Sequence, residues 1–158
     1  MNSIKIGNKR MKNLIKKWLI KSWLKKYEIT NYTINDDYTI DVYGDVSLSD
    51  CDLTEFPSYI QFGTVKGDFY CSFNHLTSLR GCPKKVEGSF NCTYNKLTTL
   101  EESPREIRGN FYCNNNKLTS LEGAPELVTK NFYCSYNSTN FSEDDVRNVC
   151  EVVEFIYV

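Results

Sequence analysis

The sequence has few of the residues on which most catalytic and metal sites depend. It contains one histidine, His75, and its seven cysteines include no Cys-x-x-Cys pair. A zinc site with the usual ligand spacing is therefore not expected. The sequence has no Gly-rich phosphate-binding loop and no His-Glu-x-x-His motif, and the single histidine has no matching nucleophile. The composition predicts a protein that is not an enzyme and that binds no metal or cofactor.

A long apolar segment is also missing. No uncharged apolar run reaches the roughly 18 residues that a transmembrane helix needs. Lysines interrupt every apolar stretch near the N-terminus, which argues against a signal peptide. We therefore expect neither a membrane anchor nor secretion.

What the sequence does contain is a repeat of fixed length. Between Gly67 and Phe141, four segments align without gaps at a spacing of 21 residues. A fixed period of this length is typical of a solenoid. The aligned columns are Phe69, Phe90, Phe111 and Phe132; Cys71, Cys92, Cys113 and Cys134; Asn74, Asn95, Asn116 and Asn137; Leu76, Leu97 and Leu118; Leu79, Leu100 and Leu121; Pro83, Pro104 and Pro125; and Val86, Ile107 and Val128.

Each column has a structural interpretation. Phe-x-Cys predicts a very short strand with two side chains on its inner face. The Asn that follows can bond backbone groups of neighbouring turns, so stacked copies predict a buried ladder. Leu-x-x-Leu points two more apolar side chains inward, and the Pro column closes the return turn. One unit cannot bury this face alone, so the repeats are expected to stack on each other.

Four of the seven cysteines occupy one inward column. A free cysteine behaves as a small hydrophobic residue and is often buried. We therefore expect buried thiols in a reducing cytoplasm rather than disulfides. His75 falls in a column otherwise filled by Lys96 and Lys117, which indicates a solvated surface position.

The repeat resembles the leucine-rich repeat. The family motif Leu-x-x-Leu-x-Leu-x-x-Asn-x-Leu is similar to Phe111-x-Cys113-x-x-Asn116-x-Leu118-x-x-Leu121. Asn116-Lys117-Leu118-Thr119-Ser120-Leu121 is similar to the Asn-x-Leu-Thr-Ser-Leu-Pro signature of the short bacterial class found in secreted effectors. The Gly-Asn-Phe-Tyr-Cys segment looks more like the repeats of small proteins encoded by tailed bacteriophages. The resemblance covers residues 44–141 and implies an α/β leucine-rich-repeat solenoid of about five repeats.

A basic helix is predicted over residues 8–28. Residues 1–28 hold nine Lys or Arg and one acid, whereas residues 29–158 hold ten Lys or Arg and nineteen acids. We expect the helix to cap the solenoid. The alternatives are an amphipathic helix on a membrane surface, a nucleic-acid patch, and a helix that docks on a partner.

The predicted helix has two apolar faces. On a helical wheel, one face contains Met11, Leu14, Ile15 and Trp18, and a roughly opposite face contains Ile20, Trp23, Leu24 and Tyr27. The docking alternative would use Lys16, Lys17, Trp18, Lys21, Trp23, Lys25 and Lys26.

Two short segments after this helix predict a β-hairpin. Residues 29–34 and 38–43 alternate and are rich in β-branched and aromatic residues, with a polar turn between them. The hairpin is expected to pair with the edge of the first repeat. That repeat begins at Gly44, 23 residues before Gly67, and places Cys51 in the Asn column. Residues 1–43 are interpreted as the N-terminal cap.

The last repeat loses its pattern, because Thr139 and Ser142 occupy the two Leu columns. Ser142 is followed by three acidic residues, which is typical of a helix start. Apolar residues then recur at helical spacing as far as Val153. We predict a capping helix over residues 143–154 and an apolar tail, 155–158, with no assigned partner. Residues 142–158 are interpreted as the C-terminal cap.

The outward columns of the repeats form a candidate binding surface. Tyr together with Ser and Asn is the composition of many protein-binding surfaces. No column on this face repeats Lys or Arg, which argues against nucleic acid. The alternative is that exposed tyrosines only reflect the β-propensity of the strands. The candidate residues of this expected concave face are Tyr70, Phe73, Asn91, Tyr94, Tyr112, Asn114, Tyr133 and Tyr136.

The sequence thus predicts a non-enzymatic scaffold that binds a protein partner through its concave Tyr/Asn face. The resemblance implies a phage protein that binds or inhibits a host protein in the bacterial cytoplasm. The alternative is a structural component of a virion or assembly, docked through the basic N-terminal helix. Membranes and nucleic acids are not expected as partners.

Overall fold

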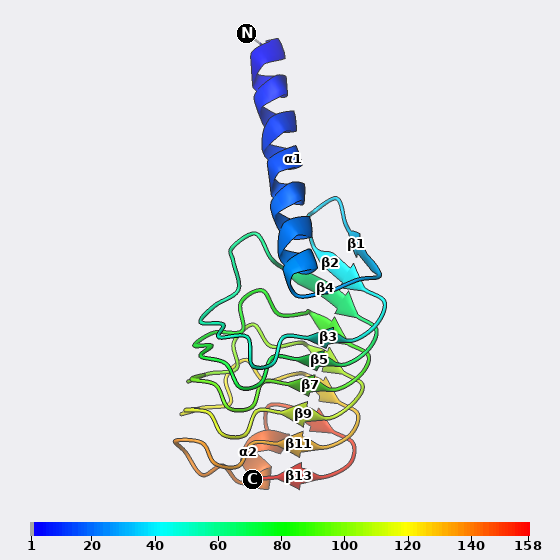
Figure 1. Ribbon diagram of the computed structural model, residues 1–158. Helices are drawn as coiled ribbons and strands as arrows, with labels where there is room; N and C mark the ends of the chain where they lie inside the picture. Colours follow the sequence, from blue (N-terminus) through cyan, green and yellow to red (C-terminus); the bar gives the residue numbers. More distant parts are fainter. Residues whose placement is uncertain (1) are drawn as a thin grey trace.

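The computed structural model describes the backbone of residues 2–158 and the side chains of residues 10–158. The chain winds into an elongated β-solenoid of about six turns. A long helix stands at the N-terminal end of the solenoid, and the C-terminus lies at the opposite end (Figure 1). Each full turn, or coil, contributes one strand to each of two sheets.

The first sheet has seven strands in the order β1-β2-β4-β6-β8-β10-β12. All neighbouring pairs are parallel except the antiparallel pair β1–β2. The inward residue of most of its strands belongs to the column of Val65, Val86, Ile107 and Val128, which is fully buried. The strands are β1 (Tyr32–Ile34), β2 (Ile40–Val42), β4 (Phe62–Val65), β6 (Lys85–Val86), β8 (Glu106–Ile107), β10 (Leu127–Val128) and β12 (Glu151–Val152).

The second sheet has six strands in the order β13-β11-β9-β7-β5-β3, all parallel. The Phe column lies in register across it, and the rings fill the centre of the solenoid: the centroids of Phe111 and Phe132 are 4.9 Å apart. The strands are β3 (Val46–Ser47), β5 (Phe69–Tyr70), β7 (Phe90–Asn91), β9 (Phe111–Tyr112), β11 (Phe132–Tyr133) and β13 (Ile156–Tyr157).

The predicted asparagine ladder is confirmed. Asn95 accepts a hydrogen bond from the Leu76 N–H at 2.9 Å, and its Nδ2 donates to the Cys71 carbonyl at 2.9 Å, both in the preceding coil. Asn74, Asn116 and Asn137 make the equivalent contacts. Each amide therefore satisfies backbone groups that would otherwise be buried without partners.

A second ladder, not foreseen from the sequence, runs along the corner between the two sheets. The Ser89 N–H donates to Asp68 Oδ1 at 2.6 Å, and the Asn110 N–H donates to Ser89 Oγ at 3.1 Å. Asp45 and Asn131 extend the row at its two ends. The side chains of this column therefore hold successive coils together.

The α/β class was wrong. A leucine-rich repeat has one sheet with helical or irregular returns, whereas every complete coil here also forms a strand around the Val/Ile column. β-Branched residues in that column favour strands, and a strand already present in one coil offers unpaired backbone groups to the next. Within residues 2–158, helix is confined to α1 (Asn2–Lys26) and α2 (Glu143–Arg147). The chain is a β-solenoid.

The predicted C-terminal capping helix over 143–154 was also wrong. α2 begins as expected, with Ser142 and Asp145 forming a reciprocal capping box, but it spans only five residues. The chain then adds a further coil, in which β12 pairs with β10 and β13 pairs with β11. Pairing with β10 and β11 satisfies backbone groups at the open edges of both sheets, which a longer helix would leave unpaired. The tail 155–158 therefore belongs to the solenoid.

The N-terminal segment divides into two parts. Ile20, Trp23 and Leu24, near the end of α1, are buried in the core, and the Trp23 ring lies 6.2 Å from that of Phe62. The preceding turns project beyond the solenoid (Figure 1). The predicted hairpin is confirmed: β1 pairs with β2, and β2 continues in parallel with β4. The first repeat is also in the predicted register, with Val46 opposite Phe69.

Candidate binding face

Tyrosines on the outer side of the six-stranded sheet form a stacked row. Tyr112 and Tyr133 have ring centroids 4.7 Å apart, and Tyr133 and Tyr157 have centroids 4.5 Å apart. The ring planes are tilted by only 13° and 3°. Parallel strands in register hold equivalent side chains at the strand spacing, which brings flat rings into contact. Tyr70 and Asn91 continue this first row in earlier coils.

A second aromatic row lies at the corner that follows the strands. It contains Phe73, Tyr94 and Tyr136, with Asn115 between the last two. The rings of Phe73 and Tyr94 stack at 4.5 Å with an interplanar angle of 9°. All three aromatic side chains are exposed, Tyr136 most of all at 78%. We call the two rows together the aromatic face.

The backbone of the second row is in the left-handed region. Phe73 and Tyr94 both have φ of 53°, and Tyr136 has φ of 56°. Asn115 has φ of 57° at the same place in its coil, and Asn is one of the few residues that tolerate this conformation well. The solenoid therefore carries exposed aromatic rings at positions where Asn costs less free energy.

Small polar residues fill the space between the two rows. Ser72 and Thr93 are buried there, whereas Asn114 and Ser135 are partly exposed. Asn91 Oδ1 accepts hydrogen bonds from the Thr93 N–H at 3.0 Å and from its hydroxyl at 2.8 Å. All eight residues predicted for a concave face thus lie on the aromatic face, with Asn114 between the rows.

Two phenols of this face, those of Tyr70 and Tyr133, have a raised pKa and are uncharged near neutral pH. Tyr70 donates a hydrogen bond to the Asp68 carboxylate, which raises the pKa of Tyr70 to about 12. Burial against its neighbours raises the pKa of Tyr133. The face therefore offers rings, hydroxyls and amides rather than charge.

The outer side of the seven-stranded sheet is different in character. Ion pairs join successive coils there: Lys66 Nζ lies 2.8 Å from Glu87 Oε1, and Lys85 Nζ lies 2.8 Å from Glu106 Oε2. Arg108 adds a second contact to Glu106 at 2.8 Å. Exposed pairs of this kind contribute little free energy each. The contrast between the sheets makes the aromatic face the distinctive surface.

The residues predicted for a docking helix do not lie together. Lys17, Trp18, Lys21, Lys25 and Lys26 are exposed. Lys16 is partly covered, because its Nζ lies 4.4 Å from the centre of the Tyr38 ring. The prediction was wrong for Trp23, because only 6% of its side chain is exposed and it packs against the solenoid. Helical periodicity alone did not reveal which apolar face the solenoid would cover.

Six of the seven thiols are buried in the core, and Cys51 is partly exposed. All seven cysteines are free, and burial raises the pKa of Cys92 and Cys113 well above the ordinary value. Among the described side chains, residues 10–158, no three His, Cys, Asp or Glu groups converge as metal ligands would. His75 is at the surface, with Nε2 4.0 Å from Asp52 Oδ1.

Tyr157 is the member of the aromatic face that sequence reasoning missed. We had read residues 151–154 as helix and 155–158 as a tail. An offset of 24 residues would have found it, because Val152 aligns with Val128 and Tyr157 aligns with Tyr133. This coil departs from the 21-residue period by three residues.

No family model, curated protein sequence or solved structure matches the chain. None of the helices in the described part of the chain has the length and apolar character needed to cross a bilayer.

Proposed function

We propose that this protein is a non-enzymatic scaffold that binds a protein partner through the aromatic face. Stacking holds the tyrosine rings of the first row in place before any partner arrives. Ordered side chains lose little conformational entropy on binding, and tyrosine supplies large contact area with a polar end. Asn114 and Ser135, which are partly exposed between the rows, supply hydrogen-bonding groups for the partner's backbone.

The left-handed aromatic residues carry this proposal. Each of these rings leaves about half or more of its surface in solvent at a strained φ near 55°, and Asn115 marks a residue that fits the same position at lower cost. Folding stability therefore does not account for Phe73, Tyr94 and Tyr136. A role for these rings in contact with a partner does account for them.

Two variants test the proposal. Tyr112→Ala/Tyr133→Ala removes the middle of the first row, and Tyr94→Asn replaces a ring with the residue that the column already contains. Partners are captured by cross-linking in cells of the native source, identified by mass spectrometry, and then measured as purified proteins. Each variant is expected to raise Kd by about 30-fold, the effect of losing about 2 kcal/mol at a binding hot spot.

Tyr43→Ala is the matched control, because Tyr43 is a half-exposed tyrosine next to the hairpin, away from both rows. It should leave Kd unchanged. Tyr94→Asn should also leave the free energy of unfolding within about 1 kcal/mol of the original, since it relieves backbone strain while it removes one stacked pair. Unchanged Kd in both aromatic-face variants would exclude this face as the binding surface.

A second candidate function, docking of a structural or assembly component through α1, is favoured by one specific observation. Met11, Leu14, Ile15 and Trp18 are each more than half exposed and lie on one side of the basic helix. Deleting residues 1–28 would not test this function, because it would also remove Ile20, Trp23 and Leu24 from the core. Leu14→Ser/Trp18→Ser changes only the exposed stripe.

The setting that we propose is the bacterial cytoplasm during phage infection, with a host protein as the partner. It is supported by the resemblance of the Gly-Asn-Phe-Tyr-Cys segment to phage-encoded repeat proteins and by the seven free cysteines. The second candidate would instead place the protein in a virion or an assembly intermediate.

A further inference from the structure

The projecting part of α1 carries an apolar stripe that the solenoid does not cover. Met11, Leu14, Ile15 and Trp18 follow helical spacing and are 59%, 58%, 51% and 66% exposed. Basic residues flank the stripe, including Lys12 and Lys17. The stripe is therefore an apolar surface with a positive border.

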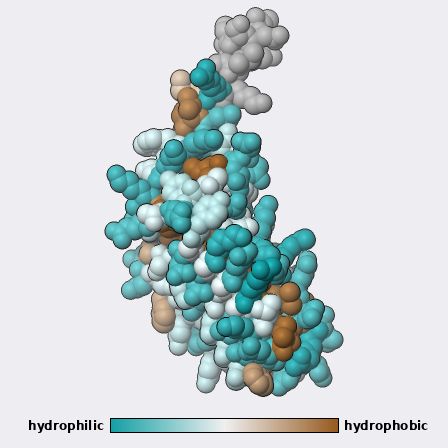
Figure 2. Space-filling model, turned by 90° about the vertical axis from the view of Figure 1, so that its right-hand side faces the viewer, coloured by the Kyte–Doolittle hydropathy of each residue, from teal (hydrophilic) through white to brown (hydrophobic). Residues whose placement is uncertain are grey.

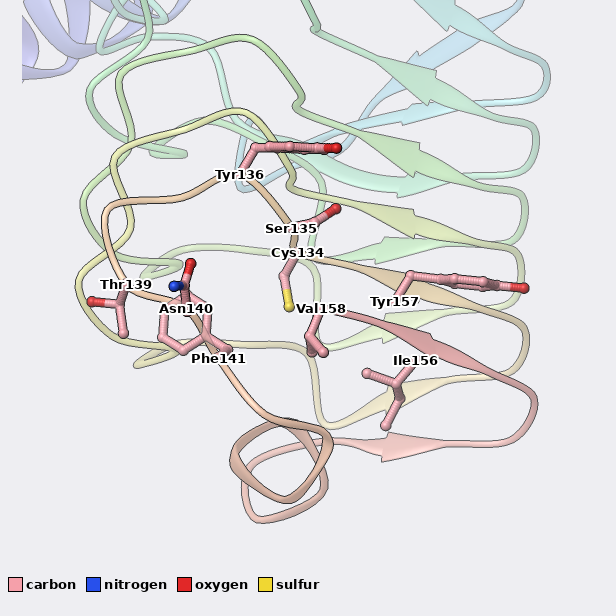
Figure 3. A pocket seen from close by; sticks show the side chains of 9 residues that line it. All are labelled: Cys134, Ser135, Tyr136, Thr139, Asn140, Phe141, Ile156, Tyr157 and Val158. Carbon is pink, nitrogen blue, oxygen red and sulfur yellow. The ribbon is translucent and has the colours of Figure 1, made fainter.

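The opposite end of the molecule carries a hollow. Its volume is about 690 Å³, and its apolar wall includes Phe141, Ile156 and Val158 (Figure 3). Val158 is 48% exposed although it occupies the inward column that contains Cys134. A side chain the size of tryptophan can enter a hollow of this volume.

The hollow lies beside an open sheet edge. Within residues 2–158, β13 pairs only with β11. Alternation along a parallel ladder directs the N–H and C=O of Ile156 away from β11. Such edges are surfaces on which another chain can be added.

The charges of the two ends are complementary. Residues 143–158 contain five acids and one arginine, whereas residues 1–28 have nine Lys or Arg and one acid. The helix and the last coil lie at opposite ends of the elongated molecule (Figure 1), so they cannot meet within one chain. Hydrophobic surface is visible both on the helix and near the opposite end (Figure 2).

We propose that the apolar stripe of α1 docks on the C-terminal hollow of a second copy of this chain. The stripe covers Phe141 and Val158, and the lysines beside it face the acids of α2. Because the two surfaces differ, the contact is head-to-tail, and each docked copy leaves one helix and one hollow free. Tyr136 and Tyr157 also line the hollow, so the contact borders the C-terminal end of the aromatic face. It would make the second candidate function an assembly of this chain with itself.

Sedimentation of the full chain across the micromolar range is the first measurement. Mass should increase with concentration beyond two copies, and molar salt should reduce it by screening the charges. A single-chain mass at every concentration in low salt would overturn the proposal. If that monomer bound anionic vesicles through the stripe, the occupant would be a membrane.

Two variants assign the surfaces. Leu14→Ser/Trp18→Ser removes the stripe, and Val158→Lys places a cation at the hollow. Both are expected to sediment as single chains with unchanged circular dichroism, because the altered side chains are about half exposed or more. Val153→Lys is the matched control: Val153 is 62% exposed and lies in the outward column that contains Lys66 in an earlier coil. It should associate like the original chain.

Mixing the two variants gives the decisive result. The stripe variant keeps its hollow and the Val158→Lys variant keeps its stripe, so an equimolar mixture should form a complex of two chains and nothing larger. Symmetric pairing of two helices, or of two β13 edges, would leave one of the variants associating by itself. Either that result or a mixture that stays monomeric would overturn the head-to-tail contact.

Discussion

Asn116 Oδ1 accepts a hydrogen bond from the N–H of Leu97 at 3.1 Å, across the boundary between two coils. The same side chain donates from Nδ2 to the Cys92 carbonyl at 3.0 Å. One amide therefore pairs both a donor and an acceptor of the preceding coil inside the core, where water cannot replace it. The asparagine column fixes how each coil sits on the previous one.

Asn116→Ala is expected to lower the free energy of unfolding by about 1–3 kcal/mol, because it leaves the Leu97 N–H and the Cys92 carbonyl buried without this partner. Urea denaturation measures the change. Asn114→Ala is the control, since Asn114 is partly exposed between the aromatic rows, and its effect should stay within about 0.5 kcal/mol. Equal effects of the two substitutions would show that the ladder does not stabilise the stack.

Gly109→Ala should destabilise the solenoid at a place where two coils approach closely. A Cβ at Gly109 would lie 2.6 Å from backbone atoms of Gly88 and Ser89. The coils would have to separate, which typically costs about 1–3 kcal/mol in a packed core. Gly44→Ala adds the same methyl group with no atom within 4 Å and should be neutral or slightly stabilising. Thermal unfolding of the pair tests this, and similar melting temperatures would contradict it.

The cysteines should differ in their reaction with iodoacetamide. Cys51 is partly exposed, whereas the other six are buried. Mass spectrometry of the native protein should find Cys51 alkylated first, and all seven modified in denaturant. Rapid modification of Cys92 or Cys113 under native conditions would indicate that the core opens.

The same thiols predict a loss of stability at alkaline pH. Burial raises the pKa of Cys134 and Cys150 from an ordinary 9.0 to about 12. As pH rises past 9, thiols ionise in the unfolded chain before they do so in the folded one, so the unfolded state is favoured. The free energy of unfolding should therefore decrease from about pH 9 toward pH 12. Cys150→Ala should reduce the slope, and a slope unchanged by this substitution would contradict the assignment.

The Asp68 carboxylate should control the titration of Tyr70. Asp68→Asn keeps an oxygen that can accept from the Ser89 N–H, but it removes the charge that faces the Tyr70 hydroxyl. The pKa of Tyr70 should fall from about 12 toward its ordinary value of 10.0. NMR of ring-labelled tyrosine follows this single group. Asp45→Asn, which removes a charge that makes no hydrogen bond to Tyr70, should produce a smaller shift.

Residues 67–141 could be interpreted well from sequence because their information is periodic. Each inward column repeats one residue type, so the burial of Phe111, Cys113 and Asn116 follows from stacking whatever the details of the turn. The outward set was also correct in its placement, since Tyr112 must face away from a strand on which Phe111 and Cys113 face inward. The concave shape expected for this surface came from the resemblance to the leucine-rich repeat, and no residue pattern indicated it.

The sequence by itself determined the repeat, its inward columns, its register and the hairpin that begins the stack, because these follow from local pattern and from regular spacing. Tertiary structure alone decided that a second sheet forms, that the chain adds a last coil, and that Trp23 is buried. Residues 146–153 contain a helical pattern, yet the open edges of β10 and β11 pair with residues 151–152 and 156–157 as strands. Both sides of α1 are apolar in sequence, and only the end of the solenoid selects Trp23 for burial and leaves Trp18 exposed. Such choices depend on which unpaired backbone and apolar surface lies alongside, which no local window contains.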